Sequence, residues 1–308
     1  MTDRPALLIL QRHLAPLTAF LESDYTVYRF WEGPPAEAEG QIRALVTAGE
    51  FPLDTALVER LPKLQLIACF TSGYDGIDVD WCRARGLPVT HAPGVNHEDV
   101  ADHAIGLILA ARRQIAAGDR TLRAGGWTPE SRIITPSLKG QRLGIVGLGA
   151  IGEAVARRAE AMRMAVRWWG PREKASPWPR AGSLLDLARD SDILVVACRA
   201  DDENVGMVSR AVIEALGPQG LLVNVARGQL VDEDALIAAL KDGRLGQAAL
   251  DVFEDEPTDP ARWAGVPNTV LTPHTGGATT EAVQGMLMLL LQNLRAAFAG
   301  EPLKTPVP

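Results

Sequence analysis

Cysteine is scarce in this sequence. Its three residues, Cys69, Cys82 and Cys198, are spread over a chain of 308 positions. They form no CxxC pair and have no neighbouring histidine, so their spacing favours neither a disulfide framework nor a zinc site. We therefore expect free thiols and no bound metal.

Long apolar runs are also missing. No stretch reaches the roughly 18 uninterrupted apolar residues of a membrane span. The opening residues MTDRPALLIL carry an acid and a base before a short apolar segment, which is not typical of a signal peptide. We expect a cytoplasmic protein without membrane partners.

Positive charge is in deficit, since 31 Lys and Arg residues stand against 38 Asp and Glu residues, for a net charge of −7. This balance argues against nucleic acid as the main partner, although a small anionic ligand would need a local basic pocket. With 47% hydrophobic and 22% charged residues, the chain is typical of a globular protein long enough for two domains.

Short apolar strands alternate with helical patterns along the chain. Strands are predicted at 6–10, 42–46, 64–69, 87–90, 143–146, 166–169, 192–197, 221–225, 247–251 and 269–271. Helices are predicted at 14–22, 55–60, 79–85, 150–164, 184–189, 211–216 and 233–241, with Ser183 as an N-cap. This alternation, which occurs twice over, predicts an α/β protein with two parallel-sheet domains.

Two longer helical patterns, at 99–117 and 279–299, flank the second group of strands and predict the crossings between domains. The first domain is then discontinuous, made of 1–98 plus 280–308. Residues 99–279 form the second domain. A cleft between the domains is where a cofactor and a substrate would be expected to meet.

A glycine turn lies near the middle of the chain. It follows an apolar strand and precedes a helix, which is the context that a GxGxxG motif requires. Glycines at this spacing permit a tight turn, a close approach to a pyrophosphate and close helix packing, while the helix N–H groups face the phosphates. The sequence therefore predicts a nucleotide site formed by Gly147, Leu148, Gly149, Ala150, Ile151 and Gly152.

The residues after the next strand favour NADP(H) over NAD(H). In this fold an Asp or Glu about 20 residues beyond the glycines binds the adenosine ribose of NAD. Gly170 and Pro171 stand there instead, and Arg172 and Lys174 follow, so a 2′-phosphate has both room and a positive partner. Alternatively, Glu173 turns back to the ribose, the two basic residues are solvated, and NAD(H) binds.

Three polar residues follow apolar strands of the second domain: Arg227, Glu256 and His274. Reduction of a 2-oxo acid needs a cation for its oxygens, a proton donor for the developing alkoxide, and a carboxylate that keeps the donor protonated. Each residue alone has an ordinary explanation as a surface charge, a solvated acid or a loop histidine. Their joint placement after strands of one nucleotide-binding unit favours the catalytic interpretation.

These motifs resemble those of the D-isomer-specific 2-hydroxyacid dehydrogenases, in the family's order and over almost the whole length. The matching segments are 71–78 (TSGYDGID), 100–107 (VADHAIGL), 147–152 (GLGAIG), 225–233 (VARGQLVDE), 250–257 (LDVFEDEP) and 273–278 (PHTGGA). The resemblance implies two Rossmann-like domains: a flavodoxin-like, substrate-binding domain of 1–98 plus 280–308 and a dinucleotide-binding domain of 99–279. It also implies Arg227 as a substrate-binding residue, His274 as the acid/base and Glu256 as its partner. It implies Ser72 and Gly73 as backbone donors to the substrate carboxylate. Around the cofactor it places Cys198, Ala226, Gly277 and, at the nicotinamide end, Asp251.

Within this family, the run Gly170-Pro171-Arg172 is similar to the NADP-preferring glyoxylate/hydroxypyruvate reductase branch. The implied reaction is hydride transfer from NADPH to C2 of a small 2-oxo acid, which gives a D-2-hydroxy acid. Two alternatives stay open: an NAD-linked dehydrogenase for lactate-like acids, and a nucleotide-sensing interaction protein of the same fold.

The resemblance also implies a homodimer, with residues 105–127 near the interface. Trp127 has an alternative explanation as a core residue, which the usual burial of large aromatic side chains favours. The apolar stretch 286–294 fits either packing between the domains or dimerisation.

Overall fold

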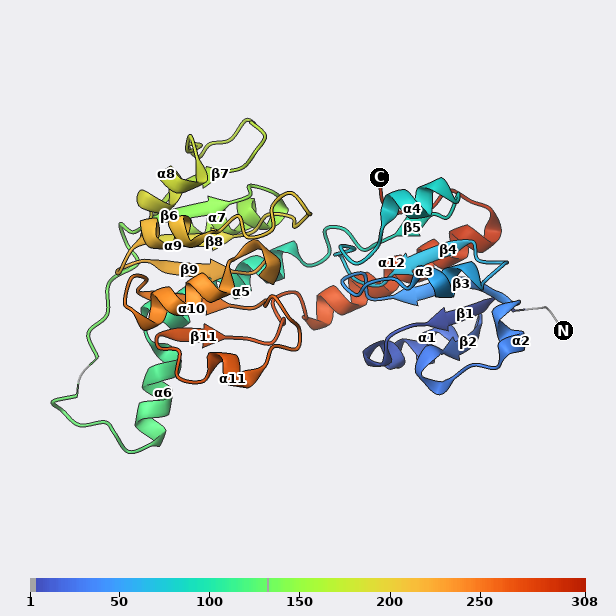
Figure 1. Ribbon diagram of the computed structural model, residues 1–308, viewed down its shortest axis with the longest axis horizontal. Helices are drawn as coiled ribbons and strands as arrows, with labels where there is room; N and C mark the ends of the chain where they lie inside the picture. The colour runs from blue at the N-terminus through green and yellow to red at the C-terminus, as the bar shows by residue number, and fades with distance from the viewer. Residues whose placement is uncertain (1–3, 132) are drawn as a thin grey trace. The chain divides into compact units, whose positions relative to one another are not determined.

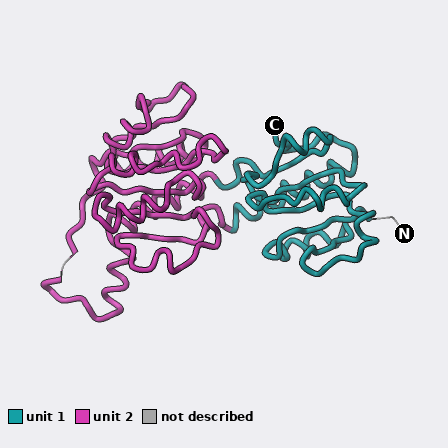
Figure 2. Tube along the Cα trace, viewed as in Figure 1, with its two compact units in different colours: residues 1–96, 280–308 teal, residues 97–279 magenta. Residues whose placement is uncertain are grey.

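The computed structural model describes residues 4–131 and 133–308. The chain forms two compact units (Figure 2), of which unit 1 comprises Met1–Asn96 with Thr280–Pro308 and unit 2 comprises His97–Thr279. Residues 1–3, part of the segment that argues against a signal peptide, lie outside the described residues. The cleft expected between the units stays a prediction.

One domain boundary differs slightly from the prediction. The predicted change at 98/99 falls inside the first turn of helix α5 (His97–Arg112), and the whole of this helix belongs to unit 2. The boundary at 279/280 coincides with the start of α12 (Thr280–Ala299). The residue ranges of the discontinuous unit therefore differ from the predicted ranges only at the first turn of α5.

Unit 1 is built on a parallel sheet. Its strands are β1 (Ala6–Ile9), β2 (Thr26–Arg29), β3 (Ile42–Thr47), β4 (Leu66–Cys69) and β5 (Val89–Thr90). They lie in the order β2-β1-β3-β4-β5, and every pairing is parallel (Figure 1). This is the flavodoxin-like order, which confirms the predicted fold class. β2 was not predicted because it is an edge strand whose side chains are at most partly buried, which weakens its apolar pattern.

Helices cover both faces of this sheet. They are η1 (Arg12–Leu17), α1 (Thr18–Leu21), η2 (Phe30–Glu32), α2 (Ala36–Glu39), α3 (Thr55–Glu59), α4 (Val79–Ala84) and α12. Successive strand residues point to opposite faces. Leu7 and Ile9 therefore pack with α1 and α12, whereas Leu8 packs with α3 and α4.

α12 is a core helix of unit 1. Met286, Leu290 and Leu294 are spaced four residues apart, lie on one face and are buried against the sheet. By length and composition alone α12 could also span a membrane, but a core helix satisfies the same criterion. For these three residues the expectation of interdomain or dimer packing is wrong, because they complete the core of unit 1.

Unit 2 is built on a second parallel sheet. Its strands are β6 (Arg142–Val146), β7 (Ala165–Trp169), β8 (Ile193–Val196), β9 (Leu221–Asn224), β10 (Gln247–Leu250) and β11 (Thr269–Leu271). They lie in the order β11-β10-β9-β8-β6-β7. All pairings are parallel, so the second predicted α/β domain is confirmed.

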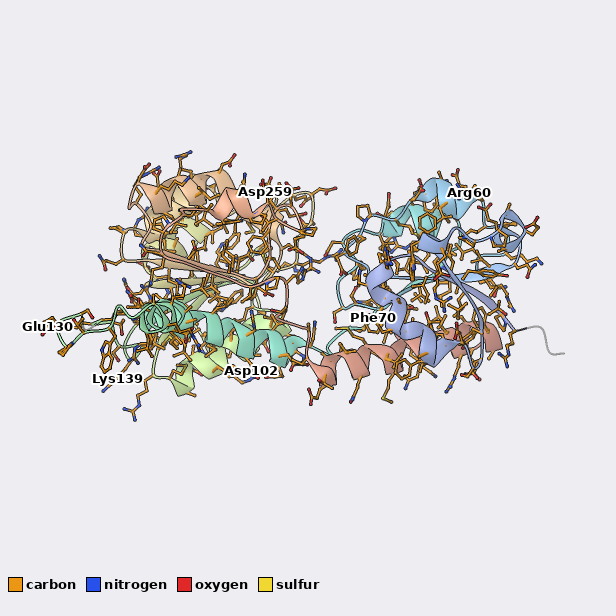
Figure 3. All side chains as sticks on the ribbon, turned by 90° about the horizontal axis from the view of Figure 1, so that it is seen from below. Arg60, Phe70, Asp102, Glu130, Lys139 and Asp259 are labelled. Atoms are coloured by element: carbon orange, nitrogen blue, oxygen red, sulfur yellow. The ribbon has the colours of Figure 1, made fainter. Side chains whose placement is uncertain are left out.

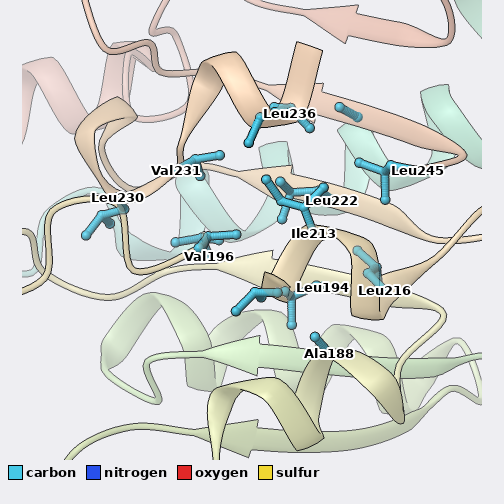
Figure 4. Packing of buried hydrophobic residues seen from close by; sticks show 14 of the residues in the cluster. Ala188, Leu194, Val196, Ile213, Leu216, Leu222, Leu230, Val231, Leu236 and Leu245 are labelled. Carbon is cyan, nitrogen blue, oxygen red and sulfur yellow. The ribbon is translucent and has the colours of Figure 1, made fainter. Parts of the chain in front are cut away.

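Both faces of this sheet are covered as well. The remaining elements of unit 2 are α6 (Ile115–Arg123), α7 (Ala150–Ala161), α8 (Leu184–Arg189), α9 (Arg210–Leu216), η3 (Gly228–Leu230), α10 (Glu233–Lys241) and α11 (Pro260–Trp263). Leu194 and Val196 of β8 pack against α8, α9 and α10 (Figure 4), whereas Ile193 and Val195 face α5 and α7. The hydroxyl of Ser183 accepts the N–H of Asp186 and caps α8, as predicted.

The helix predicted at 99–117 is interrupted. α5 ends at Arg112, whose buried guanidinium donates to the carbonyl oxygens of Gln219 and Asp192 and so anchors the helix end to the sheet. Gln114 then adopts the left-handed conformation with φ 51°, and α6 begins at the next residue. Periodicity alone missed this break because apolar residues continue on both sides of it.

The segment after α6 leaves the body of unit 2. Figures 1 and 3 show the stretch that carries Glu130 extending away from the sheet. Trp127 on this segment is 70% exposed and Ile134 is 89% exposed. The alternative that Trp127 is a core residue of the subunit is therefore wrong.

Candidate active site

The glycine turn joins β6 to α7 with the geometry that a dinucleotide needs. Gly147 has φ 91°, and a Cβ atom there would lie 2.5 Å from the Cβ of Cys198. A Cβ on Gly152 would lie 2.1 Å from the carbonyl oxygen of Gly147, so the helix packs tightly on the turn. A Cβ on Gly149 would meet no non-neighbouring atom within 4 Å, which leaves its backbone open to a ligand. Gly147 thus permits the turn and Gly152 the helix packing, whereas the approach of a phosphate to Gly149 stays a prediction.

The N-terminus of α7 is open at this turn. Its N-cap residue is Gly149, which has no side chain that could accept hydrogen bonds from the first N–H groups of the helix. Those N–H groups and the helix dipole favour an anion. β6 lies between β7 and β8, so the turn stands at the point where the strand order reverses, and ligands bind at such points. The turn therefore fits the pyrophosphate of NAD(P).

The basic residues after β7 have different surroundings. Arg172 is exposed and forms no ion pair with a described residue. Lys174 turns back toward the glycine turn, where its Nζ donates to the carbonyl oxygen of Leu148 at 2.8 Å and pairs with Glu153 of α7. Arg172 is thus available to a phosphate, whereas the ammonium group of Lys174 is already bound within unit 2.

The turn before Arg172 is held by Arg180. The Nη2 group of Arg180 donates to the carbonyl oxygen of Gly170 at 2.7 Å. Its Nη1 lies 3.3 Å from a carboxylate oxygen of Glu173, whose side chain is 89% exposed. Glu173 therefore pairs with a neighbouring arginine in this structure, which gives no support to the alternative in which it binds the ribose.

Three further residues assigned to the cofactor lie in segments that follow β8, β9 and β11. Burial raises the pKa of the Cys198 thiol to about 11, so this group stays protonated. Ala226 is buried, and its N–H donates to Oδ1 of Asn224 at 3.0 Å. Gly277 is partly exposed. Their contacts with a cofactor stay predictions.

Arg227 is positioned by the turn that follows β9. Asn224 is 1% exposed, and its amide donates to the carbonyl oxygen of Arg227 at 2.8 Å. Gly228 lies so close to the backbone of 253–254 that an added Cβ would overlap it. This close approach holds Arg227 beside the segment that leads to Glu256.

His274 and Glu256 form the central pair of the site. Nδ1 of His274 lies 2.6 Å from Oε2 of Glu256, and Oε1 of Glu256 accepts the N–H of Phe253 at 3.0 Å. Because a carboxylate only accepts, Nδ1 carries a proton toward Glu256 and Nε2 is left for a ligand. The two side chains are 36% and 32% exposed, so a ligand can reach them.

The pair shifts the titration of both groups. The hydrogen bond to Glu256 raises the pKa of His274, against the effects of partial burial and of the positive charge of Arg227. Burial alone would raise the pKa of Glu256, but hydrogen bonds from His274 and the Phe253 N–H outweigh it, and the pKa falls below its usual value. His274 is therefore held as an acid to higher pH than an isolated histidine.

Asp251 anchors the His274 segment. It directly follows β10 and is 2% exposed. Its carbonyl oxygen accepts the N–H of His274 at 2.8 Å, and its carboxylate accepts those of Thr275 and Gly276 at 2.9 and 2.8 Å. His274 has φ 52°, and these bonds on both sides hold it in the left-handed conformation.

His103 and Thr272 complete the surroundings of Asp251. Thr272 donates to Oδ1 of Asp251 at 2.5 Å, and Nε2 of His103 lies 3.2 Å from the same oxygen. Burial would raise the pKa of Asp251, but hydrogen bonds from His103, Thr272 and two backbone N–H groups lower it to about 2. Both carboxylate oxygens are thus bonded within unit 2, and the nicotinamide contact assigned to Asp251 stays a prediction.

Ser72 and Gly73 follow β4 in unit 1. The Ser72 hydroxyl donates to the carbonyl oxygen of Ala92 at 2.6 Å, which fixes the loop. The backbone N–H groups of Ser72 and Gly73 donate to no described residue. Two adjacent N–H groups without an acceptor among the described residues are compatible with an anion. The carboxylate site assigned to them stays a prediction.

Sequence reasoning missed Asn224, His103 and Thr272. Asn224 carried a usable signal, because a buried polar residue at the end of an apolar strand calls for a partner in the following turn. His103 had none, since it meets Asp251 and Thr272 only through the packing of α5 on the sheet.

Comparison with known proteins agrees with this geometry. Residues 105–276 match the family described as D-isomer specific 2-hydroxyacid dehydrogenase, NAD binding domain. The chain is 42% identical to hydroxyphenylpyruvate reductase of Plectranthus scutellarioides and 41% identical to glyoxylate/hydroxypyruvate reductase A of Arabidopsis thaliana, each over 96% of this chain and 97% of the relative.

A solved structure is similar over the same extent. The NADPH-dependent glyoxylate/hydroxypyruvate reductase of Sinorhizobium meliloti, in complex with NADP and malonate, superimposes with a TM-score of 0.91 at 33% identity. The match covers 99% of this chain and 97% of that chain. Family match, full-length identity and common fold agree, and the chain therefore belongs to the D-isomer specific 2-hydroxyacid dehydrogenase family.

Proposed function

We propose that this protein reduces a small 2-oxo acid of the glyoxylate or hydroxypyruvate type to the D-2-hydroxy acid, with NADPH as the reductant. The observation that carries the proposal is the 2.6 Å contact between Nδ1 of His274 and Glu256. It leaves the other ring nitrogen for a ligand and raises the pKa of the ring, which favours its protonated form. The names of the Arabidopsis and Sinorhizobium relatives support this substrate class.

Each polar residue has one task in the reaction. The N–H groups of Ser72 and Gly73 bind the substrate carboxylate, and Arg227 binds and polarises the carbonyl oxygen. NADPH supplies a hydride to C2 when it is bound. His274 donates the Nε2 proton to the oxygen, and Glu256 stabilises the imidazolium before the transfer. In the reverse direction neutral His274 accepts the proton.

The preference for NADPH rests on Arg172. Its exposed guanidinium has no described ion-pair partner, and a planar guanidinium suits a 2′-phosphate. Gly170 stands where an acid would repel that phosphate. The NADP bound to the Sinorhizobium relative is consistent with this choice. NAD(H) remains usable in this account, because the pyrophosphate site does not depend on Arg172.

The same protein is proposed to be a cytoplasmic homodimer. All three cysteines are free, which suits a reducing compartment. Leu122 of α6 and Trp127 are exposed and line a hollow of about 440 Å³ together with Ile133. An exposed apolar surface of this kind is typical of an interface, and a second copy of the chain is the partner proposed for it. Sedimentation velocity of the wild type and of Trp127→Ser tests this, and a monomeric wild type contradicts it.

Initial rates test the proposed reaction. Glyoxylate, hydroxypyruvate, pyruvate and 2-ketogluconate are each supplied with NADPH and with NADH. We expect the highest kcat/KM for glyoxylate or hydroxypyruvate with NADPH. Higher rates with NADH and pyruvate would support the lactate-type dehydrogenase instead, and tight NADPH binding without reduction of any acid would support a nucleotide sensor.

A further inference from the structure

Glu50 is a carboxylate with no basic partner among the described residues, and it lies at the edge of unit 1 that carries Ser72 and Gly73. It follows β3 and is partly buried. Its Oε2 accepts a hydrogen bond from the hydroxyl of Thr71 at 2.9 Å. Within the described residues, no Lys, Arg or His pairs with Glu50, and its Oε1 accepts no hydrogen bond. One oxygen of a negatively charged group is therefore open to a ligand.

The loops after β3 and β4 are interlocked, so Glu50 has a fixed place beside the free N–H groups. The Gly49 N–H donates to the Thr71 hydroxyl at 2.9 Å, and the Gly76 N–H donates to the carbonyl oxygen of Gly49 at 2.9 Å. A Cβ on Gly49 would lie 2.2 Å from the carbonyl oxygen of Gly73. Only a residue without a side chain permits this approach, which brings Glu50 next to the loop that carries Ser72 and Gly73.

This place is also the switch point of the unit 1 sheet. The strand order reverses between β1 and β3, and ligands of open α/β sheets bind outside the carboxyl ends of the strands at such a point. Gln11, which follows β1, accepts the N–H of Ala48 at 2.9 Å and so joins the segments on the two sides of the switch point. Glu50 comes two residues after Ala48 along the chain.

We propose that Glu50 selects the group that the substrate carries on C3. It admits monocarboxylic 2-oxo acids with a hydrogen, or preferably a hydroxyl, at this position, and it rejects acids with a second carboxylate there. The inference rests on the proposed function, because it needs the first carboxylate to lie on the N–H groups of Ser72 and Gly73. A C3 hydroxyl donates to the open oxygen of Glu50, whereas a second carboxylate meets the like charge of Glu50, with which no described Lys, Arg or His pairs.

Steady-state kinetics with NADPH test the proposal. For the wild type we expect kcat/KM to decrease in the order hydroxypyruvate, pyruvate, oxaloacetate. Glu50→Gln keeps an acceptor for Thr71 but removes the charge, so the ratio of oxaloacetate to pyruvate should rise about tenfold or more. Glyoxylate, which has no C3, should change little. Glu37→Gln, an exposed residue of α2, is the matched control and should leave every ratio unchanged.

A binding measurement separates this proposal from the reaction itself. Calorimetry on the NADP⁺ complex compares D-lactate with tartronate, which carries a carboxylate in place of the methyl group. Glu50→Gln should raise the affinity for tartronate about tenfold relative to the affinity for D-lactate. Unchanged ratios in both experiments would overturn the role of Glu50 and leave it as a support of the Thr71 loop. A wild type that reduces no acid, but shows the change in binding, would overturn the reductase proposal alone.

Discussion

Both units of this protein are parallel sheets whose ligand-facing residues follow the carboxyl ends of strands, yet they offer different chemistry. Unit 2 presents the charged side chains of Arg227, Glu256 and His274. Buried residues hold their segments in place: Asn224 donates to the carbonyl oxygen of Arg227, and Asp251 accepts the N–H groups of residues 274–276. In the loops after β3 and β4, unit 1 presents the backbone N–H groups of Ser72 and Gly73 and the carboxylate of Glu50, which forms no ion pair with a described residue. We infer that unit 2 determines whether a carbonyl is reduced, and unit 1 determines which acid is accepted.

The largest loss is expected for His274→Asn. Asparagine tolerates the left-handed backbone of this position, so the segment keeps its fold, but no group transfers a proton to the carbonyl oxygen. We expect kcat to fall by about 10² to 10⁴ with little change in NADPH affinity. Steady-state rates and fluorescence titration measure the two quantities. A variant with nearly normal kcat would mean that unit 2 does not supply the acid.

Gly49→Ala tests the contribution of unit 1. Its Cβ would lie 2.2 Å from the carbonyl oxygen of Gly73, so the loop that carries Ser72 and Gly73 must move. We expect KM for the 2-oxo acid to rise roughly tenfold or more while NADPH affinity stays the same. Gly40→Ala is the control, since its Cβ meets only one backbone oxygen, at 3.8 Å. An equal rise in both variants would show that the effect is not local to the loop.

Arg172→Ala divides the two cofactors. It removes a charged partner of the 2′-phosphate and should lower kcat/KM for NADPH roughly 10- to 100-fold, with NADH changed little. Lys174→Ala is the comparison on the same segment, and its effect should be smaller because its ammonium group is bound to Leu148 and Glu153. An equal loss of kcat/KM for NADPH and NADH in Arg172→Ala would contradict the proposed preference for NADPH and favour NAD(H) as the cofactor.

Glu256→Gln changes the pH dependence. The carboxylate raises the pKa of His274, so its loss should lower that pKa. Reduction needs the protonated ring, and its rate falls as pH rises through this pKa. The fall should therefore move to lower pH in the variant. Glu254→Gln removes a neighbouring exposed charge and should leave the profile unmoved. An identical profile for wild type and Glu256→Gln would refute the assigned partnership.

Much of this organisation was predictable from the sequence, because it depends on local pattern. Strand and helix periodicity predicted both sheets. The spacing of Gly147, Gly149 and Gly152 predicted a tight turn with close helix packing, which the structure shows, and a phosphate approach, which stays a prediction. Arg227 and His274 were identified because polar residues after apolar strands of a parallel sheet face its binding edge.

What the sequence did not reveal depends on contacts between distant residues. His103 reaches Asp251 only because α5 packs on the sheet, and Glu50 lies beside Thr71 only because Gly49 permits the two loops to interlock. The break at Gln114 was hidden because the apolar pattern continues across it. Nothing in local composition distinguishes these residues from ordinary surface groups.

The proposed reduction of a 2-oxo acid by NADPH is tested most directly by identifying the product of one reaction. The purified protein is mixed with NADPH and hydroxypyruvate, and the loss of NADPH absorbance is compared with the amount and configuration of the glycerate formed. We predict one molecule of D-glycerate for each NADPH oxidised. NADPH that binds and remains unoxidised, or a product of the L configuration, would contradict the account.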